Sequence, residues 1–381
     1  MNSLALVPAQ VCNRCVMDES SRVIYFDQFG NCNYCESFFN FGNLKNDGTR
    51  KNSAELTDVI RRIKFKGRER RYDCIVGVSG GVDSAYLLLK AVDLGLRPLV
   101  VHMDNNWNSE LAQNNISQLV RRLDLDMETY VIRWPEYRAL MQSFLDADVI
   151  DIELLYDNAV MGVTNRMARK HGIQVILNGT NRSTEGMPMP RAWNWYKSDA
   201  RNIRAIAKEH GVKEFQSFPF SSTLDIFKRK YVWRIEVVPL LDLLGYNKDN
   251  ALDLLVTNYG FKPYPYKHYE SIFTRFYQGF LLPTKFGVDK RRQHLSNLIV
   301  TGQIDRERAL SELNLDPYVT PMELFRDKRF FLKKMGWSNA DLDEYLARQE
   351  RSHGDFPNER KYLDFAIRLR NSIKRRGRKV T

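Results

Sequence analysis

Ser79-Gly80-Gly81-Val82-Asp83-Ser84 follows an apolar, strand-like run at residues 74–78 and precedes a helix-like run at residues 85–89. Two adjacent glycines let the backbone approach an anion closely, and the start of the following helix offers free N–H groups and the positive end of its dipole. Ser79 and Ser84 add hydroxyl donors. The stretch therefore predicts a phosphate-binding loop between a strand and a helix of an α/β domain.

This loop differs from the better-known phosphate loop, G-x-x-x-x-G-K-[ST], because both that spacing and its lysine are absent. Any cation that meets the phosphates must come from elsewhere. The six residues resemble the signature of the PP-loop ATP pyrophosphatases. That resemblance implies an enzyme that cuts ATP between the α- and β-phosphates and leaves AMP on a substrate oxygen. An ordinary glycine turn in an α/β domain is the alternative.

Strand-like and helix-like segments alternate around the loop, which predicts a doubly wound parallel sheet with ligands at the carboxyl ends of its strands. The resemblance implies a PP-loop, adenine nucleotide α-hydrolase-like fold. The predicted strands cover residues 73–78, 98–103, 127–132 and 173–178, and the predicted helices cover 83–94, 109–123, 136–147 and 156–171. Beyond about residue 245 the pattern is helical, at 247–258, 271–281, 290–301, 305–313, 321–334, 338–347 and 359–377.

These segments suggest four parts of the chain. We expect a zinc-ribbon module at 1–45, a linker and connecting helix at 46–70, an ATP-binding α/β domain at 71–245, and a helical C-terminal part with a basic tail at 246–381. Residues 42–51 are polar and predict the linker, and Ser53 is the expected N-cap of a connecting helix that ends near Gly67.

The net charge of +12 is concentrated near the carboxyl end. Residues 361–381 hold eight Lys or Arg and one Asp, so the rest of the chain is only mildly basic. Such a tail is more typical of a solvated helix end than of a specific RNA reader. No apolar run approaches the length of a bilayer span, and residues 1–11 lack a basic start and a long hydrophobic segment, so we expect a cytoplasmic protein.

Four of the five cysteines form two C-x-x-C pairs, Cys12 with Cys15 and Cys32 with Cys35, separated by sixteen residues. This spacing is typical of a zinc site, and the segment between the pairs predicts a hairpin. Four thiolates close the coordination shell, so we expect a structural role. The alternatives are a disulfide pair or redox centre, which a reducing cytosol disfavours, and an iron–sulfur centre.

Cys74 lies inside the first predicted strand and is expected to be a small buried hydrophobe. Sulfur delivery to tRNA needs reactive cysteines in the catalytic domain, and this domain offers only Cys74. The chain begins Met1-Asn2-Ser3, without an N-terminal cysteine nucleophile that could hydrolyse glutamine. We therefore expect another subunit to supply any ammonia that is used.

Two further strand ends carry polar residues. Asp104 follows the second strand, where an acid could contact the ribose or base of a nucleotide, with a plain capping role as the alternative. Residues 179–185, G-T-N-R-S-T-E, resemble the second ATP-contacting loop of PP-loop amidotransferases and synthetases, with an ordinary turn as the alternative. Trp193, Trp195 and Tyr196 could stack on a sugar or base, although packing between domains is the favoured interpretation.

The helical C-terminal part has its densest chemistry at residues 267–278 and 286–292. Cations here could supply the charge that the phosphate loop lacks and stabilise the pyrophosphate leaving group. A solvated helix face is the alternative for each of them. The candidates are Arg275, Lys285, Lys290 and Arg291.

Together these pieces resemble the N-acetyl sugar amidotransferases of bacterial surface-polysaccharide biosynthesis. The resemblance covers nearly the whole chain and is most specific at residues 270–276 and 289–292. It implies an ATP-dependent, AMP-forming carbon–nitrogen ligase that converts an acetamido group of a nucleotide-linked sugar into an acetamidino group, in lipopolysaccharide O-antigen or nonulosonic-acid biosynthesis. ATP activates the amide oxygen as an adenylylated imidate, and ammonia then displaces AMP.

The same resemblance implies the cofactors, site residues and partners. ATP, Mg²⁺ and Zn²⁺ are the expected cofactors, Glu185 could hold Mg²⁺, and Asp83, Arg275, Lys290 and Arg291 are the candidate catalytic residues. A glutaminase subunit, possibly with a cyclase-like barrel subunit, is the expected source of ammonia. The residues expected to contact ATP are Ser79, Gly80, Gly81, Val82, Asp83, Ser84, Asp104, Gly179, Thr180, Arg182 and Glu185.

Two other functions stay open from the residues. A tRNA-modifying PP-loop enzyme can also join a cysteine-rich ribbon to this loop, but the missing cysteines disfavour thiolation, and the basic charge lies in one tail rather than along a broad groove, which disfavours lysidine-type chemistry. A non-enzymatic zinc-ribbon protein that binds RNA or a partner is the third interpretation. The intact phosphate loop disfavours it.

Overall fold

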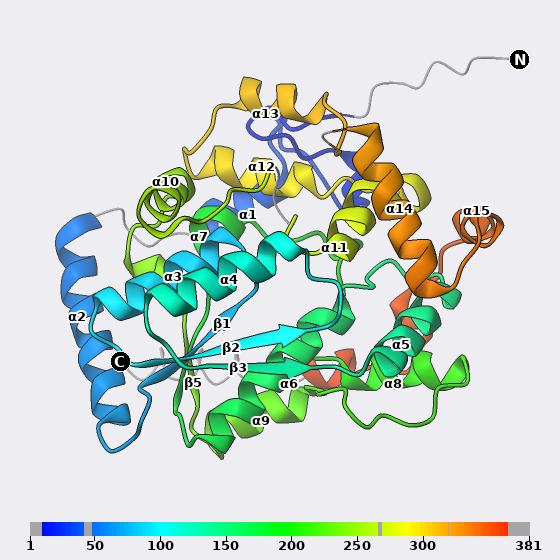
Figure 1. The fold of residues 1–381 in the computed structure, drawn as a ribbon. Coiled ribbons are helices and arrows are strands. Elements are labelled where there is room, and N and C mark those ends of the chain that lie inside the picture. Colours follow the sequence, from blue (N-terminus) through cyan, green and yellow to red (C-terminus); the bar gives the residue numbers. More distant parts are fainter. Residues whose placement is uncertain (1–9, 42–47, 266–268, 319, 365–381) are drawn as a thin grey trace, which may run out of the picture.

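The computed structural model describes residues 10–41, 48–265, 269–318 and 320–364, and a parallel five-stranded sheet forms its centre (Figure 1). The strands lie in the order β3-β2-β1-β4-β5, so the chain starts in the middle and builds outward in both directions. Their bounds are β1 Cys74–Val78, β2 Pro98–Asp104, β3 Met127–Val131, β4 Val175–Leu177 and β5 Glu236–Val238.

Helices cover both faces of the sheet, which confirms the predicted doubly wound α/β class (Figure 1). α3 (Val82–Asp93) and α4 (Glu110–Arg122) connect β1, β2 and β3 over one face, and α6 (Leu154–Lys170) packs against β1, β2 and β4 on the other. The direction of winding changes between β1 and β4. In open sheets of this type, that switch point is where the loops diverge and ligands bind.

The predicted strands and α/β helices are confirmed with shifts of up to two residues at their ends. The structure adds elements between β4 and β5 that the sequence pattern did not indicate, because they are short or follow a long polar stretch. They are α7 Arg182–Glu185, α8 Ala200–Glu209 and α9 Thr223–Tyr231. α5 (Trp134–Asp146) packs against α8 beside the sheet.

Side chains of β1 alternate between two cores because successive residues of a strand face opposite sides of the sheet. Ile75 belongs to the core on the α6 side, whereas Cys74 and Val76 belong to the core under α3 and α4. Cys74 is fully buried, and burial raises the pKa of its thiol. The expectation of a packing role for Cys74 is confirmed.

The N-terminal module contains little regular structure before α1 (Asn33–Phe41). The expected hairpin is limited to two isolated antiparallel bridges, Val11 with Asp18 and Phe26 with Cys32, and to a short 3-10 turn, η1 (Glu19–Ser21). The connecting helix α2 runs over Gly48–Gly67 and so begins before Ser53, which is not its N-cap. Residues 42–47 of the predicted linker lie outside the described residues.

The C-terminal part is helical as predicted and arches over the carboxyl end of the sheet (Figure 1). The helix expected at 271–281 is divided into α11 (Ile272–Phe276) and a π-helix, η3 (Tyr277–Phe286), which contains Pro283 and its missing N–H donor. Most of the helix expected at 359–377 lies outside the described residues. The other elements are η2 Leu240–Leu243, α10 Lys248–Tyr259, α12 Arg291–Val300, α13 Arg306–Leu313, α14 Pro321–Met335, α15 Asn339–Ala347 and η4 His353–Asp355.

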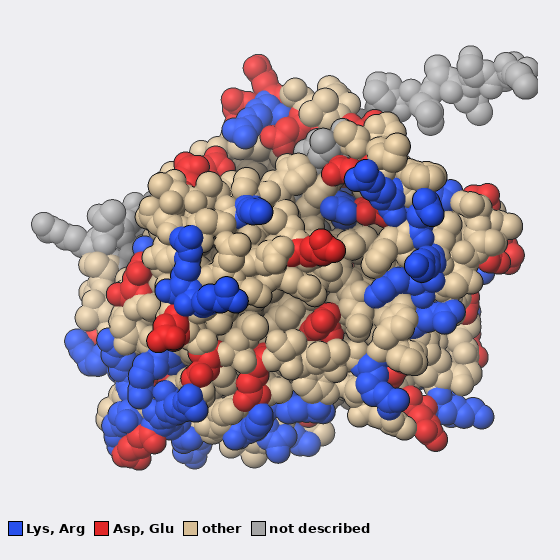
Figure 2. All heavy atoms as spheres, in the orientation of Figure 1, with Lys and Arg blue, Asp and Glu red and all other residues tan. Residues whose placement is uncertain are grey.

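The surface carries mixed charge. Figure 2 shows Lys and Arg side chains interspersed with Asp and Glu over the visible face. Among the described residues, no helix combines the length and the apolar character needed to cross a membrane.

Candidate functional site

The loop between β1 and α3 has the backbone that its glycines predict. Gly80 has φ +89°, and a Cβ at this position would lie 2.8 Å from the Cβ of Ala112, so only glycine fits without strain. Gly81 is the N-cap of α3 and makes no side-chain cap, which leaves the first-turn N–H groups of this helix for another acceptor. The Ser84 hydroxyl donates to the Gly81 carbonyl (3.1 Å) and thereby closes the loop on itself.

The second predicted loop, after β4, meets the first one. A Cβ at Gly179 would lie 3.8 Å from both the Cα and the N of Ser84. The Thr184 hydroxyl donates to the Asp83 carboxylate (3.4 Å), and the Tyr246 hydroxyl donates to the other oxygen of the same carboxylate. Asp83 therefore links the start of α3 to α7 and to the segment after η2.

Glu185 belongs to the same corner. It is exposed at the end of α7, and its charge acts on the Tyr246 hydroxyl together with that of Asp83. Burial is the main cause that raises the pKa of Tyr246, and the two carboxylates add to it. The predicted phosphate loop and the predicted Mg²⁺ ligand thus lie around one tyrosine, which gives this corner two carboxylates near the switch point of the sheet.

α12 holds the second loop from outside. The Asn297 amide accepts from the Met187 N–H (2.6 Å) and donates to the Ser183 carbonyl (2.7 Å), and Gln303 also donates to Ser183 (2.6 Å). The Arg182 guanidinium lies over the ring of Phe38, 5.6 Å from the ring centroid. The backbone N–H of Arg182 donates to the Asp242 carboxylate. Thr180 is exposed beside this support, and its N–H donates to Asn178.

Asp104 ends β2 at the same edge of the sheet. One of its carboxylate oxygens accepts from the Asn106 N–H (2.7 Å) and from the Asn108 amide (3.4 Å). Lys334 of α14 donates to the Asn106 carbonyl and packs its ammonium over Trp134 (4.1 Å). Burial lowers the pKa of Lys334, and the nearby Asp104 opposes that shift. Asp104 thus has a capping role, which agrees with the alternative weighed for it, and a contact with a nucleotide stays a prediction.

The C-terminal part reaches the phosphate loop through Glu270. The Oε1 of Glu270 lies 3.6 Å from the place that a Cβ on Gly81 would occupy. Its carbonyl accepts from the Ser109 N–H (2.9 Å) at the start of α4, and the Tyr264 hydroxyl donates to the Gly80 carbonyl (2.9 Å). The predicted nucleotide site is therefore completed by residues outside the α/β domain.

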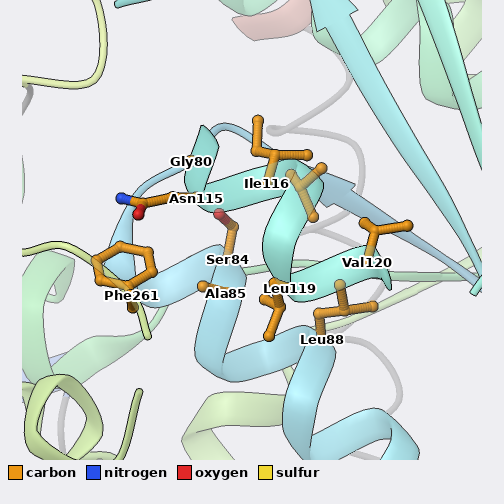
Figure 3. A pocket seen from close by; sticks show the side chains of 10 residues that line it. Gly80, Ser84, Ala85, Leu88, Asn115, Ile116, Leu119, Val120 and Phe261 are labelled. Atoms are coloured by element: carbon orange, nitrogen blue, oxygen red, sulfur yellow. The ribbon is translucent and has the colours of Figure 1, made fainter. Parts of the chain in front are cut away.

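A small apolar cavity of about 10 Å³ lies beneath the loop, between α3 and α4 (Figure 3). Such a volume holds at most about one water molecule. Leu88, Leu119 and Phe261 are among the side chains that line it. This cavity is therefore too small for a nucleotide.

Each basic residue proposed for the C-terminal part has a carboxylate partner. Arg275 forms two short hydrogen bonds with Asp327 (2.5 and 2.6 Å), Lys290 pairs with Glu153 (2.5 Å), and Arg291 pairs with Asp289 (2.8 Å). Lys285 is almost fully buried in an ion pair with Asp148 (3.0 Å). Among the described residues, no hydrogen bond or ion pair joins these four side chains to residues 79–84, so their phosphate-binding and catalytic roles stay predictions.

The buried ion pair of Arg275 with Asp327 leads to a testable prediction. Replacing Arg275 with methionine leaves the buried Asp327 carboxylate without its cation, so the free energy of unfolding should fall by about 3–5 kcal/mol in urea denaturation. The double variant Arg275→Met/Asp327→Asn removes that uncompensated charge and should recover most of the loss. If the single variant is as stable as the wild type, the pair has no structural role. If the double variant folds but forms no AMP, whereas Asp327→Asn alone still forms it, Arg275 is also catalytic.

The four cysteines converge as their spacing predicts. All four Sγ atoms lie within 4.8 Å of one another and are fully buried. The Cys12–Cys35 and Cys15–Cys32 sulfur distances are 3.9 and 3.7 Å, close to the roughly 3.8 Å that a tetrahedral ion with Zn–S bonds of about 2.3 Å imposes. Disulfide bonds would need about 2.05 Å. The donor set therefore fits a closed, structural zinc site.

This cysteine module docks onto the C-terminal helices rather than onto the phosphate loop. Arg306 donates to the carbonyls of Cys12 (3.0 Å) and Cys15 (3.0 Å). The Val16 N–H donates to the Ser296 hydroxyl (3.1 Å), and Arg292 pairs with Asp18 (2.9 Å). The module consequently supports α12, the helix that holds the second predicted ATP-contacting loop.

The aromatic cluster has the packing role that was favoured. Trp193 is fully buried and its indole N–H donates to the Ser20 carbonyl (3.0 Å), while Trp195 stacks on His353 at 5.3 Å. Sequence reasoning did not single out Tyr246, and it placed Glu270 only within a motif. Both depend on contacts across more than 150 residues, for which one sequence offers no local signal.

Comparisons with known proteins agree with parts of this description. Residues 270–370 match the family described as LPS biosynthesis protein WbpG-like, C-terminal domain. No curated protein matches the chain significantly.

Two solved structures are similar to part of the chain. The NMN synthetase from Francisella tularensis is 14% identical, with 58% of this chain and 100% of that chain covered and a TM-score of 0.30. The NH3-dependent NAD synthetase from Campylobacter jejuni subsp. jejuni NCTC 11168, in complex with the nitrate ion, is 17% identical, with 54% and 84% covered and a TM-score of 0.27. Both TM-scores are low, and the site described above rests on the contacts of this chain alone.

Proposed function

We propose that this protein is an ATP-dependent, AMP-forming amidotransferase of lipopolysaccharide biosynthesis that converts an acetamido group of a nucleotide-linked sugar into an acetamidino group. The observation that carries the proposal is the position of the Glu270 carboxylate, which lies 3.6 Å from the place that a Cβ on Gly81 would occupy. Glu270 is the first residue of the region that matches the lipopolysaccharide family, and Gly81 is the N-cap of α3 in the phosphate loop. The part of the chain with the biosynthetic likeness thus lies beside the glycine loop that would bind the nucleotide.

The chemistry requires activation of a poor electrophile. An amide carbon resists attack by ammonia because its oxygen is a poor leaving group, and transfer of AMP to that oxygen gives it a good one. The uncapped start of α3 and the glycine backbone would orient the phosphates of ATP. Asp83 and Glu185 are the carboxylates that would hold Mg²⁺, which supplies charge neutralisation for the pyrophosphate.

None of the five cysteines is placed to act as the nucleophile that would release ammonia from glutamine. Cys74 is buried in β1 and the other four cysteines converge on the metal site. Ammonia would come from a glutaminase subunit, possibly with a cyclase-like barrel subunit, or from free ammonium. The zinc module would contribute by stabilising the fold, because its four thiolates leave no open coordination position for a substrate.

One assay tests the proposal. The protein is incubated with ATP, Mg²⁺, ammonium and UDP-linked acetamido or diacetamido hexoses, and the sugar nucleotides are analysed by mass spectrometry while AMP and pyrophosphate are measured. The expected product has one oxygen replaced by NH and appears with equal amounts of AMP. AMP that forms only when unmodified tRNA replaces the sugar would overturn the proposal in favour of a tRNA-modifying enzyme.

A further inference from the structure

An open hollow of about 420 Å³ lies along α14, the helix in which Lys and Arg side chains follow one another on the visible face of the molecule (Figure 2). Sites for small molecules typically measure about 300–1,000 Å³, so the hollow is large enough for a nucleotide. The residues that line it are Arg326, Arg329, Phe330, Leu332 and Lys333. The three cations and the phenylalanine stand at positions i, i+3, i+4 and i+7 and therefore share one face of the helix.

The three cations of this hollow lack counter-ions in the described part of the chain. The side chains of Arg326, Arg329 and Lys333 are exposed and make no hydrogen bond or ion pair with any described residue. Arg329 has only a ring contact, with its guanidinium 5.7 Å from the ring centroid of Phe325. Like charges three and four positions apart destabilise a helix, and an anion in the hollow would remove that repulsion.

The two acids of α14 do not neutralise the hollow. Asp327 is buried and holds Arg275 through two short hydrogen bonds (2.5 and 2.6 Å). Glu323 is not among the lining residues. This distinguishes the hollow from the four basic residues that the sequence suggested for phosphate binding, each of which has a carboxylate partner.

α14 brings the hollow to the carboxyl end of the sheet. Phe330 packs edge to face on Trp107, with ring centroids 5.8 Å apart, and Trp107 follows Asp104 at the end of β2 by three positions. One turn after Phe330, Lys334 donates to the Asn106 carbonyl. The hollow therefore borders the loop that follows β2.

The other end of that loop meets the residues beside the glycine loop. Asn108 forms an isolated antiparallel bridge with Ser271, and the Ser109 N–H donates to the Glu270 carbonyl (2.9 Å). The Glu270 carboxylate lies 3.6 Å from the place that a Cβ on Gly81 would occupy. A single short loop thus connects the α14 hollow with the predicted ATP site.

The chemistry of the hollow selects a nucleoside diphosphate. Guanidinium groups offer paired N–H donors that match phosphate oxygens, and three positive charges attract a diphosphate strongly. Phe330 is 36% exposed and offers part of its ring, on which a base can stack. A membrane or an RNA would need a broad basic surface, whereas Figure 2 shows Lys and Arg interspersed with Asp and Glu elsewhere on this face.

We propose that Arg326, Arg329 and Lys333 bind the diphosphate of the nucleotide-linked sugar, with its base against Phe330. This inference rests on the proposed function, because it assigns the nucleotide half of that acceptor to a place. The sugar would then reach across the loop after β2 toward the ATP bound at the glycine loop.

The variant Arg329→Gln and the triple variant Arg326→Gln/Arg329→Gln/Lys333→Gln test the inference. The affinities for UDP and for UDP-N-acetylglucosamine, measured by calorimetry, should fall about tenfold in the single variant and about a hundredfold in the triple one, as expected for lost hydrogen bonds to charged groups. Added salt should weaken UDP binding more in the wild type than in the triple variant. The affinity for ATP with Mg²⁺ and the thermal midpoint should not change, because the three side chains are exposed and support no other described residue.

Arg121→Gln is the matched control, because this exposed arginine in the last turn of α4 undergoes the same chemical change away from the hollow and should lose nothing. Equal UDP affinity in the triple variant and the wild type would overturn the inference and leave the proposed function standing. An equally large loss of affinity for ATP would also overturn it, because the cations would then serve the ATP site. Binding of phosphatidylglycerol vesicles or tRNA that depends on the three cations, with UDP binding unchanged, would overturn it in favour of a macromolecular surface. Failure of the wild-type protein to bind any sugar nucleotide would overturn the proposed function itself.

Discussion

Replacing Cys15 with serine is expected to remove zinc from the protein and to unfold the N-terminal module. Cys15 lies 3.7 Å from Cys32 in the four-thiolate group, and a serine hydroxyl is a poor substitute for a thiolate ligand. Zinc contributes about 10–16 kcal/mol to the folding of isolated zinc fingers, far more than the small apolar core of this module could replace. The measurements are metal content by mass spectrometry and limited proteolysis of residues 10–41.

Cys74→Ala is the control for this prediction. Cys74 is equally buried but lies in β1, so its removal should leave the zinc content at one per chain and the module protected from protease. A Cys15→Ser protein that retains full zinc, or a module that resists protease without it, would contradict the assignment of a structural metal site.

The metal module should also influence the nucleotide site, although it does not touch the phosphate loop. Val16 and Asp18 hold α12 through Ser296 and Arg292, and α12 holds the second loop through Asn297. These contacts form an unbroken path from the thiolates to Ser183. Loss of zinc should therefore weaken ATP binding as well as the fold of the module.

The strands and the loops at their ends could be predicted because their signals are local. β1 and β2 are apolar runs followed by polar turns, and the glycine pair that allows the positive φ of Gly80 is visible in the sequence itself. β5 (Glu236–Val238) escaped prediction because it is fixed by its pairing with β4, which lies about sixty residues earlier in the chain. The end of the helix at Phe276 also escaped, because a π-helix continues the same apolar pattern.

The sequence predicts only those parts of the candidate site that lie within a single loop. Tyr246 donates to Asp83 across 163 positions, and Glu270 approaches Gly81 across a comparable separation. Such contacts are products of the packing of the C-terminal part on the sheet. The pairing of Arg275 with Asp327 is of the same kind, since an arginine in a motif does not reveal which carboxylate neutralises it.

Asp83→Asn is expected to have the largest effect on catalysis, because this carboxylate is the point where the two nucleotide loops meet. Asparagine keeps the shape. Its single amide oxygen can still accept from the Tyr246 hydroxyl, and its NH2 group can donate to the Thr184 hydroxyl, which has Asn181 as another acceptor, so the fold and the thermal midpoint should hold. The negative charge that would hold Mg²⁺ at the phosphates is lost. The rate of pyrophosphate release in the presence of a sugar-nucleotide acceptor should fall about 10²–10³-fold, the range seen when one electrostatic group of an active site is removed.

Asp93→Asn provides the comparison within the same helix, since Asp93 ends α3 and pairs with Lys90 at the surface. Its pyrophosphate release should match that of the wild type. If Asp83→Asn released pyrophosphate at the rate of Asp93→Asn, the charge of Asp83 would have no part in the reaction, and its bonds to Tyr246 and Thr184 would be purely structural. Each variant loses one carboxylate from α3, but only the carboxylate of Asp83 faces the second loop. The difference between their rates of pyrophosphate release therefore decides whether the switch point of this sheet is a reaction centre.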